Sequence, residues 1–143
     1  MKHLIFIGKP ATGKTLFAKM IFGTEKTMWL DGRHSLLKTH FTFDHRGAWN
    51  YNTIVIDDLR SDFNIESFYT TISAPVLKID RQGREPITVT MPRFVFILES
   101  ADMLPLDSAS FNRRFKVIDF DKHKISSLLK LIKTEKITII TSR

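Results

Sequence analysis

The sequence predicts an α/β fold built around a central, mostly parallel β-sheet. Short apolar runs rich in β-branched residues recur along the chain, segments with a helical apolar pattern separate some of them, and a glycine-containing turn joins the first run to the first helix. The length of 143 residues and the apolar content of 43% suit a single core. We therefore expect one domain over residues 1–143.

The first expected strand covers His3–Ile7, and the first expected helix covers residues 15–22. The turn between them has the form G-x-x-x-x-G-K-T and reads Gly8-Lys9-Pro10-Ala11-Thr12-Gly13-Lys14-Thr15. Two glycines permit unusual backbone angles, so that successive N–H groups can surround phosphate groups at a helix N-terminus. Lys14 would contact the β- and γ-phosphates, and Thr15 would help to coordinate Mg²⁺. The turn, together with Leu16 after it, predicts an ATP site with Mg²⁺ as the only metal.

A second motif follows the β-branched run Thr53-Ile54-Val55-Ile56, which is another expected strand. Two adjacent acids, Asp57 and Asp58, end this run. The carboxyl ends of parallel strands form the edge of the sheet where α/β proteins bind ligands, so these acids would lie beside the turn. We expect Asp57 to hold Mg²⁺, directly or through water, and Asp58 to orient or deprotonate the attacking water. The alternative is an acidic turn that only ends the strand.

The remaining elements are expected in the following order. A strand at 27–30 precedes a polar stretch with Leu36 and Leu37 that has a weak helical pattern. Asp62 is the expected N-cap of a helix that packs on the sheet through its apolar residues, Phe63, Ile65, Phe68 and Ile72. Strands at 93–98 and 116–120, a helical pattern at 125–132 and a short strand at 137–140 complete the chain.

Residues 75–80 and 86–90 alternate apolar and polar side chains around Arg81-Gln82-Gly83-Arg84-Glu85, which predicts a β-hairpin with a basic tip. Lys78, Arg81 and Arg84 could follow a nucleic-acid backbone, or they could protect an exposed sheet edge from aggregation. The net charge of +7 and the pI near 9.8 favour a polyanionic partner, with a solvated basic face as the alternative.

Composition excludes several classes of function. The absence of cysteine excludes disulfides and thiolate metal sites. The five histidines show no tight pairing with acids that would indicate zinc, with the adjacent Asp44 and His45 as the one exception. No segment has the length and apolarity of a membrane span, and the first residues lack a signal-peptide pattern. We expect a cytoplasmic protein without a membrane partner.

In the order and spacing of its motifs, the chain resembles the AAA+ ATPases, and among them the superfamily 3 helicase domains of viral and mobile-element replication proteins. Residues 8–15 and the Asp57-Asp58 pair correspond to the two nucleotide motifs, and Trp29-Leu30-Asp31-Gly32 weakly resembles the aromatic segment between them. The resemblance extends from His3 to about Phe120. It implies a three-layer P-loop NTPase sandwich with a pre-sensor β-hairpin that touches single-stranded nucleic acid.

The resemblance also implies three further site residues. Ser100 ends the sensor strand, where the family usually presents an asparagine that orients water. Ser100 could donate a hydrogen bond in its place, or Glu99 could instead act as an acid or pair with an arginine. Arg113 or Arg114, within Asn112-Arg113-Arg114-Phe115, would be the finger that neutralises the γ-phosphate in a neighbouring subunit, which implies a homo-oligomeric ring. The alternative is a pair of surface arginines at a helix end. Neither an N-terminal oligomerisation domain nor a C-terminal lid is evident in the sequence.

We therefore expect ATP hydrolysis coupled to translocation or remodelling of nucleic acid. Two alternatives stay open. The first is a small-molecule or nucleotide kinase in which the hairpin would act as a lid, and the second is a non-motor assembly switch that binds ATP.

Overall fold

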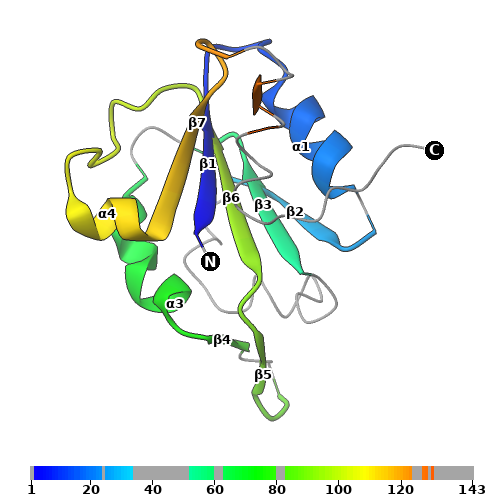
Figure 1. Cartoon of the computed structure of the whole chain (residues 1–143). Helices are drawn as coiled ribbons and strands as arrows, with labels where there is room; N and C mark the ends of the chain where they lie inside the picture. The colour runs from blue at the N-terminus through cyan, green and yellow to red at the C-terminus, as the bar shows by residue number, and fades with distance from the viewer. Residues whose placement is uncertain are drawn as a thin grey trace.

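The computed structural model describes residues 2–23, 25–33, 52–59, 63–79, 83–123, 127, 128 and 130. At its centre lies a five-stranded sheet with the order β2-β3-β6-β1-β7, and all four pairings are parallel (Figure 1). The strands are β1 (His3–Ile7), β2 (Thr27–Asp31), β3 (Thr53–Asp57), β6 (Arg93–Leu98) and β7 (Phe115–Asp119). The predicted α/β class with a central parallel sheet is confirmed.

The strand sequences explain this arrangement. All five residues of β1 are buried, and five of the six residues of β6 are buried. Strands that are covered on both faces need nearly continuous apolar runs, which these sequences provide. The predicted bounds of β1 and β6 are correct, while β2 and β3 each continue one residue further, and β7 both begins and ends one residue earlier than predicted.

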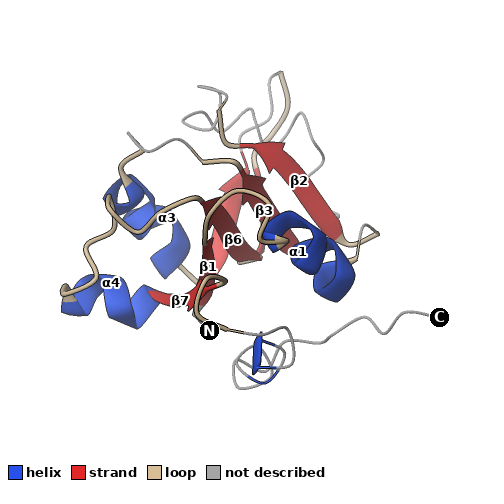
Figure 2. Ribbon diagram, turned by 90° about the horizontal axis from the view of Figure 1, so that it is seen from above, coloured by secondary structure: helices blue, strands red, loops and turns tan. Residues whose placement is uncertain are grey.

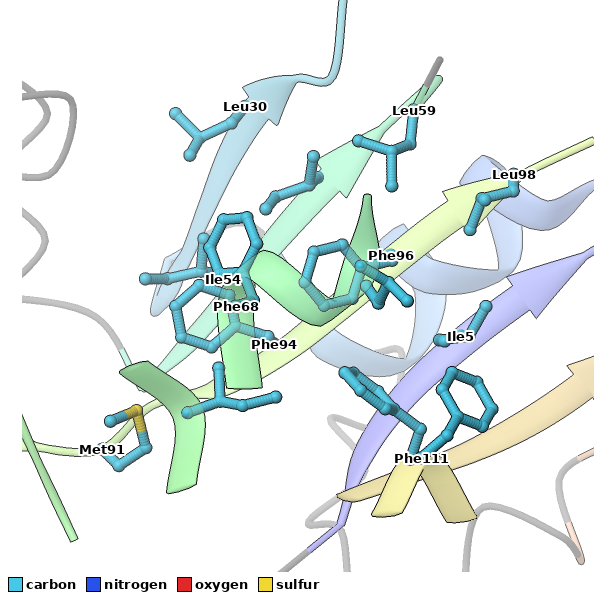
Figure 3. Packing of buried hydrophobic residues seen from close by; sticks show 14 of the residues in the cluster. Ile5, Leu30, Ile54, Leu59, Phe68, Met91, Phe94, Phe96, Leu98 and Phe111 are labelled. Carbon is cyan, nitrogen blue, oxygen red and sulfur yellow. The ribbon is translucent and has the colours of Figure 1, made fainter. Parts of the chain in front are cut away.

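Helices cover the two faces of the sheet, which gives three layers (Figure 2). On one face, Leu4, Phe6 and Val95 pack against α1 (Lys14–Phe22) through Phe17 and Ile21. The opposite face carries a second cluster, in which strand residues pack against η3 (Ile65–Phe68), α3 (Tyr69–Ser73) and α4 (Ala109–Arg114) (Figure 3). Alternate residues of each strand therefore enter different cores.

The segment after β3 differs from its prediction. It begins with the 3₁₀-helix η3 and continues as α3, so the regular helix is shorter and later than expected. The N-cap of η3 is Asn64, whose side-chain oxygen accepts a hydrogen bond from the Glu66 N–H at 3.0 Å. The expected cap, Asp62, lies outside the described residues. The apolar residues Phe63, Ile65, Phe68 and Ile72 do pack on the sheet as predicted.

The predicted β-hairpin is confirmed. Strands β4 (Val76–Ile79) and β5 (Ile87–Thr90) pair antiparallel and form a small sheet of their own. The chain continues from β5 into β6 through Met91 and Pro92, so the hairpin lies at the amino end of the central sheet (Figure 1). Arg81 at the tip lies outside the described residues, as do Leu36, Leu37 and the segment 137–140, while the helical pattern at 125–132 is described at 127, 128 and 130 alone.

Candidate nucleotide-binding site

The turn between β1 and α1 depends on its two glycines. A Cβ atom at Gly8 would lie 3.0 Å from Thr12 Oγ1 and 3.1 Å from Phe120 Cβ, so a side chain at this position would crowd the loop. Gly13 has a φ of 85°, a left-handed conformation that glycine adopts without strain, and Ala11 has a φ of 65°. The chain therefore reverses within a few residues and enters α1 directly.

The N-terminus of α1 has the features of an anion site. Its first turn contains no acidic residue, and no side chain caps it. The first N–H groups of a helix have no partner within the helix, and the helix dipole adds partial positive charge at this end. A phosphate group at this position would accept hydrogen bonds from these N–H groups.

Lys14 supplies a buried positive charge at the same end of α1. Its side chain donates to Gly8 O at 2.5 Å, Lys9 O at 2.9 Å and Thr12 Oγ1 at 3.3 Å. All three acceptors are neutral, and Lys14 forms no ion pair with another described residue. A buried ammonium group without a nearby anion is costly, so the position of Lys14 fits a negatively charged ligand.

Thr15 and Asp57 bring two oxygen ligands together across the layers of the fold. The Thr15 hydroxyl, on α1, donates to Asp57 Oδ1 at 3.1 Å and Oδ2 at 3.0 Å at the end of β3. Hydroxyl and carboxylate oxygens are ligands that Mg²⁺ accepts, with waters and phosphate oxygens completing its coordination. In the part of the chain that the structure describes, no group of three or more His, Cys, Asp or Glu residues could hold a metal by itself.

Gly32 allows the carboxyl ends of β2 and β3 to lie in direct contact. Its N–H donates to Asp57 O at 2.6 Å, and a Cβ atom at Gly32 would lie only 2.7 Å from Leu59 Cα. This contact holds Asp31 beside Asp57, its register partner on β3. Sequence reasoning did not include Gly32 among the site residues, although a glycine that directly follows a strand was the available signal.

Arg33 connects the end of β2 to Asp58, the second acid after β3. Its guanidinium lies 2.9 Å from Asp31 Oδ2 and 3.3 Å from Asp58 Oδ2. The hydrogen bond to Asp31, with the charges of Asp31 and Asp58, raises the pKa of Arg33 above its ordinary value. A pocket of about 560 Å³ lies here, and its lining includes Trp29, Arg33, Asp57 and Asp58. Arg33 was not among the predicted site residues, because its contact with Asp58 depends on how β2 and β3 align.

The loop has one further long-range contact that was not predicted. The Lys9 N–H lies 3.3 Å from both carboxylate oxygens of Asp121, which follows β7. Strand β7 pairs with β1, and this pairing brings Asp121 beside the loop. A separation of 112 residues between Lys9 and Asp121 leaves no local signal in the sequence.

Ser100 lies at the same edge of the sheet as the loop. It follows β6, and Leu98 of β6 pairs with Ile7 of β1, directly before Gly8. The Ser100 hydroxyl accepts a hydrogen bond from the Asp102 N–H at 3.0 Å, and the residue is exposed. The loop, Asp57, Asp58 and Ser100 therefore share one edge of the sheet.

The other predicted site residues lie at the opposite end. Arg113 and Arg114 directly precede β7, whose first residue, Phe115, pairs with His3 at the start of β1. Five strand residues span about 16 Å, so neither arginine is at the loop of its own chain. Lys78 and Arg84 belong to the hairpin and lie at this amino end as well, while Arg81 is outside the described residues.

The two arginines differ in their surroundings. Arg114 donates from Nε to Ser73 Oγ and from Nη1 to Ser110 O, both at 2.8 Å, and its guanidinium lies 4.5 Å from the centre of the Tyr69 ring. Arg113 is exposed, with one long hydrogen bond of 3.4 Å to Ser110 Oγ. Arg114 is therefore held by its own chain, whereas Arg113 is accessible to a second molecule.

The fold and the site define an α/β protein with a parallel five-stranded sheet and a glycine-containing loop at the carboxyl edge of that sheet. No protein-family model matches the chain, and no curated protein matches it. Two solved structures of the NrS-1 C-terminal region, both in an A form without ligand, are similar in fold. One is 18% identical with a TM-score of 0.61 over 93% of this chain, and the other is 21% identical with a TM-score of 0.53 over 92%.

The chain spans about a third of these structures, 34% of the first and 32% of the second. At these identities the likeness extends to the fold alone. Among the helices of the described residues, none has the length and apolarity that a membrane span needs.

Proposed function

We propose that this chain binds ATP with Mg²⁺ at residues 8–16 and hydrolyses it. One observation carries the proposal: the Lys14 ammonium is buried at the N-terminus of α1, and no acidic side chain among the described residues pairs with it. The next residue, Thr15, forms the contact with Asp57. A triphosphate would provide the missing negative charge, and Thr15 and Asp57 would hold Mg²⁺. When bound, the metal would neutralise charge on the β- and γ-phosphates.

Within this proposal, Asp58 orients the attacking water. It lines the same pocket as Asp57 and directly follows it in the chain. Its φ of 57° is uncommon for a residue other than glycine, and such conformations concentrate at functional sites. Ser100, at the same edge, is available to donate a hydrogen bond to that water or to the γ-phosphate.

A neighbouring copy supplies the arginine finger in this proposal. Arg113 is exposed at the end of the sheet opposite its own loop, so it can serve a second subunit and not its own site. Hydrolysis would then depend on assembly into a homo-oligomer. The basic hairpin, with Lys78 and Arg84, and the net charge of +7 support single-stranded nucleic acid as the substrate of a motor that resembles superfamily 3 helicases.

The test is steady-state ATP hydrolysis with Mg²⁺ over a range of protein concentrations, with and without single-stranded DNA. Lys14→Ala serves as the blank, because it removes the phosphate-binding charge. We expect turnover per subunit to rise with protein concentration and again with DNA. A turnover per subunit that changes neither with protein concentration nor with DNA would contradict the proposal of a motor. Transfer of phosphate to an added acceptor in place of water would identify a kinase.

A further inference from the structure

The carboxylate of Asp121 and the ammonium of Lys14 contact the two ends of one peptide unit. The Lys9 N–H lies 3.3 Å from each carboxylate oxygen of Asp121, and the Lys14 side chain donates to Gly8 O at 2.5 Å. Gly8 O and the Lys9 N–H belong to the same trans peptide unit and point in opposite directions. The carboxylate therefore faces the positive end of this peptide dipole, and the ammonium faces the negative end.

The backbone of Asp121 is held firmly, although its side chain is exposed. The preceding residue, Phe120, donates its N–H to the last residue of β1 at 2.8 Å. The Phe120 ring packs in the core against Phe6 and Phe17, with ring centres 5.1 Å and 5.3 Å away. The Asp121 N–H donates to Asp119 Oδ1 at 2.9 Å. The sheet and the first core helix thus fix where the carboxylate meets the loop.

This arrangement gives Lys14 a nearby negative charge without a direct ion pair. A carbonyl whose own peptide N–H is bound by a carboxylate is a stronger acceptor, because hydrogen bonds in a chain polarise one another. The effect is greatest where the ammonium is buried, as it is here. Since the carboxylate stays one peptide unit away, the ammonium remains able to contact a phosphate group.

We propose that Asp121 is a positioning residue, which holds Lys14 in place for a phosphate group through the peptide unit between Gly8 and Lys9. This inference rests on the proposed function, because the phosphate group belongs to the nucleotide. Asp121 reaches the loop from the far end of the sequence, through the pairing of β7 with β1.

The variant Asp121→Ala removes the carboxylate from the loop. We expect the Kd for ATP with Mg²⁺, measured by calorimetry, to rise about twofold to fivefold, a small factor because the contact is long and exposed. The KM should rise by the same factor and kcat should stay unchanged, because Lys14 binds the phosphates in the ground state and the transition state alike. A loop that had lost its structure would lower kcat as well.

Two further variants separate the contact from a general effect of charge. Asp121→Asn keeps an oxygen that can accept from the Lys9 N–H but lacks the charge, so its Kd should lie between those of the original chain and Asp121→Ala. Glu25→Gln removes the same charge from an exposed position between α1 and β2, at the opposite end of α1 from the loop. It should leave the Kd unchanged.

A double-mutant cycle without nucleotide tests the link to Lys14 directly. Asp121→Ala is made in the original chain and in Lys14→Met, and the free energy of unfolding in urea is measured for all four chains. We expect Asp121→Ala to lose more stability in the original chain than in Lys14→Met, because only the original chain has a buried ammonium for the carboxylate to stabilise.

The outcomes distinguish this inference from the proposed function. Equal losses in the two backgrounds would overturn the positioning role, and the proposed function would stand wherever ATP binding still depends on Lys14. Tighter ATP binding in both Asp121→Ala and Asp121→Asn would also overturn it, because the carboxylate would then only repel phosphate. Unequal losses without Lys14-dependent ATP binding would mean that the proposed function is wrong, and the positioning of Lys14 for a phosphate would fail with it.

Discussion

His3 is a buried titratable residue that joins three elements of the fold. Its Nδ1 accepts a hydrogen bond from the Phe94 N–H at 2.9 Å, and its Nε2 lies 3.4 Å from Ile72 O on α3. These contacts require a neutral ring. Burial lowers the pKa of His3 from 6.5 to about 4, and the charge of Arg93 acts in the same direction, while the hydrogen bond to Ile72 opposes it.

The lowered pKa predicts a loss of stability in mild acid. Between pH 6.5 and about 4 the unfolded chain binds a proton at His3 and the folded chain does not, so the contribution is complete above pH 6.5 and is lost as the pH falls toward 4. The titration of His3 changes the free energy of unfolding by about 3 kcal/mol over this range. Urea unfolding at pH 7 and pH 4.5 measures it. His3→Asn, which keeps an acceptor for Phe94, should lose less stability over that range; an equal loss would contradict the role of His3.

The surroundings of Lys14 predict that its replacement has opposite effects on the stability of the free chain and on nucleotide binding. Because its buried charge meets only neutral acceptors, we expect Lys14→Met to leave the free energy of unfolding unchanged or raise it by about 1–2 kcal/mol in the absence of nucleotide. The same variant should lose the stabilisation that ATP with Mg²⁺ gives the unaltered chain. Thermal melting with and without nucleotide tests both. A variant that melts far below the original chain would show that Lys14 holds the loop together.

At the scale of elements, the contact between the ends of β2 and β3 is the least tolerant junction of the candidate site. Gly32→Ala would place a methyl group within 2.7 Å of Leu59 Cα and 2.8 Å of Asp57 O, so the strands would have to separate. We expect a loss of about 2–4 kcal/mol in the free energy of unfolding.

Gly83→Ala is the matched control, because its Cβ atom would have nothing within 4 Å, although its φ of 71° is strained for alanine. This variant should cost about 1 kcal/mol. Urea unfolding of the two variants gives the comparison, and equal losses would show that the close contact at Gly32 is not limiting.

The elements also show what the sequence could predict. Strands β1 and β6 were placed correctly because a buried parallel strand is a continuous apolar run, and the loop was located because its residue types are fixed by local backbone geometry. Helix α4 was missed because six residues are too few for a periodic pattern. The contacts of Arg33 with Asp58 and of Lys9 with Asp121 were missed because strand pairing, and not local sequence, brings these residues together.

At the scale of the whole molecule, the candidate site and Arg113 lie at opposite ends of one sheet. If Arg113 serves a neighbour, two inactive variants should complement each other. Lys14→Ala chains have an intact Arg113, and Arg113→Gln chains have an intact loop. We expect a mixture of the two to hydrolyse ATP faster than the sum of the separate variants. A mixture that stays at that sum would argue against an arginine supplied between subunits.

Strand β6 has a further consequence for the molecule. The hairpin leads into its first residue, Arg93, and Ser100 follows its last residue, Leu98. These six residues span about 20 Å and are hydrogen-bonded on both sides to β1 and β3, so the strand cannot stretch. It therefore fixes the distance between the Ser100 end of the sheet and the basic hairpin, and because its hydrogen bonds hold it in register with β1 and β3, neither end can shift without the rest of the sheet.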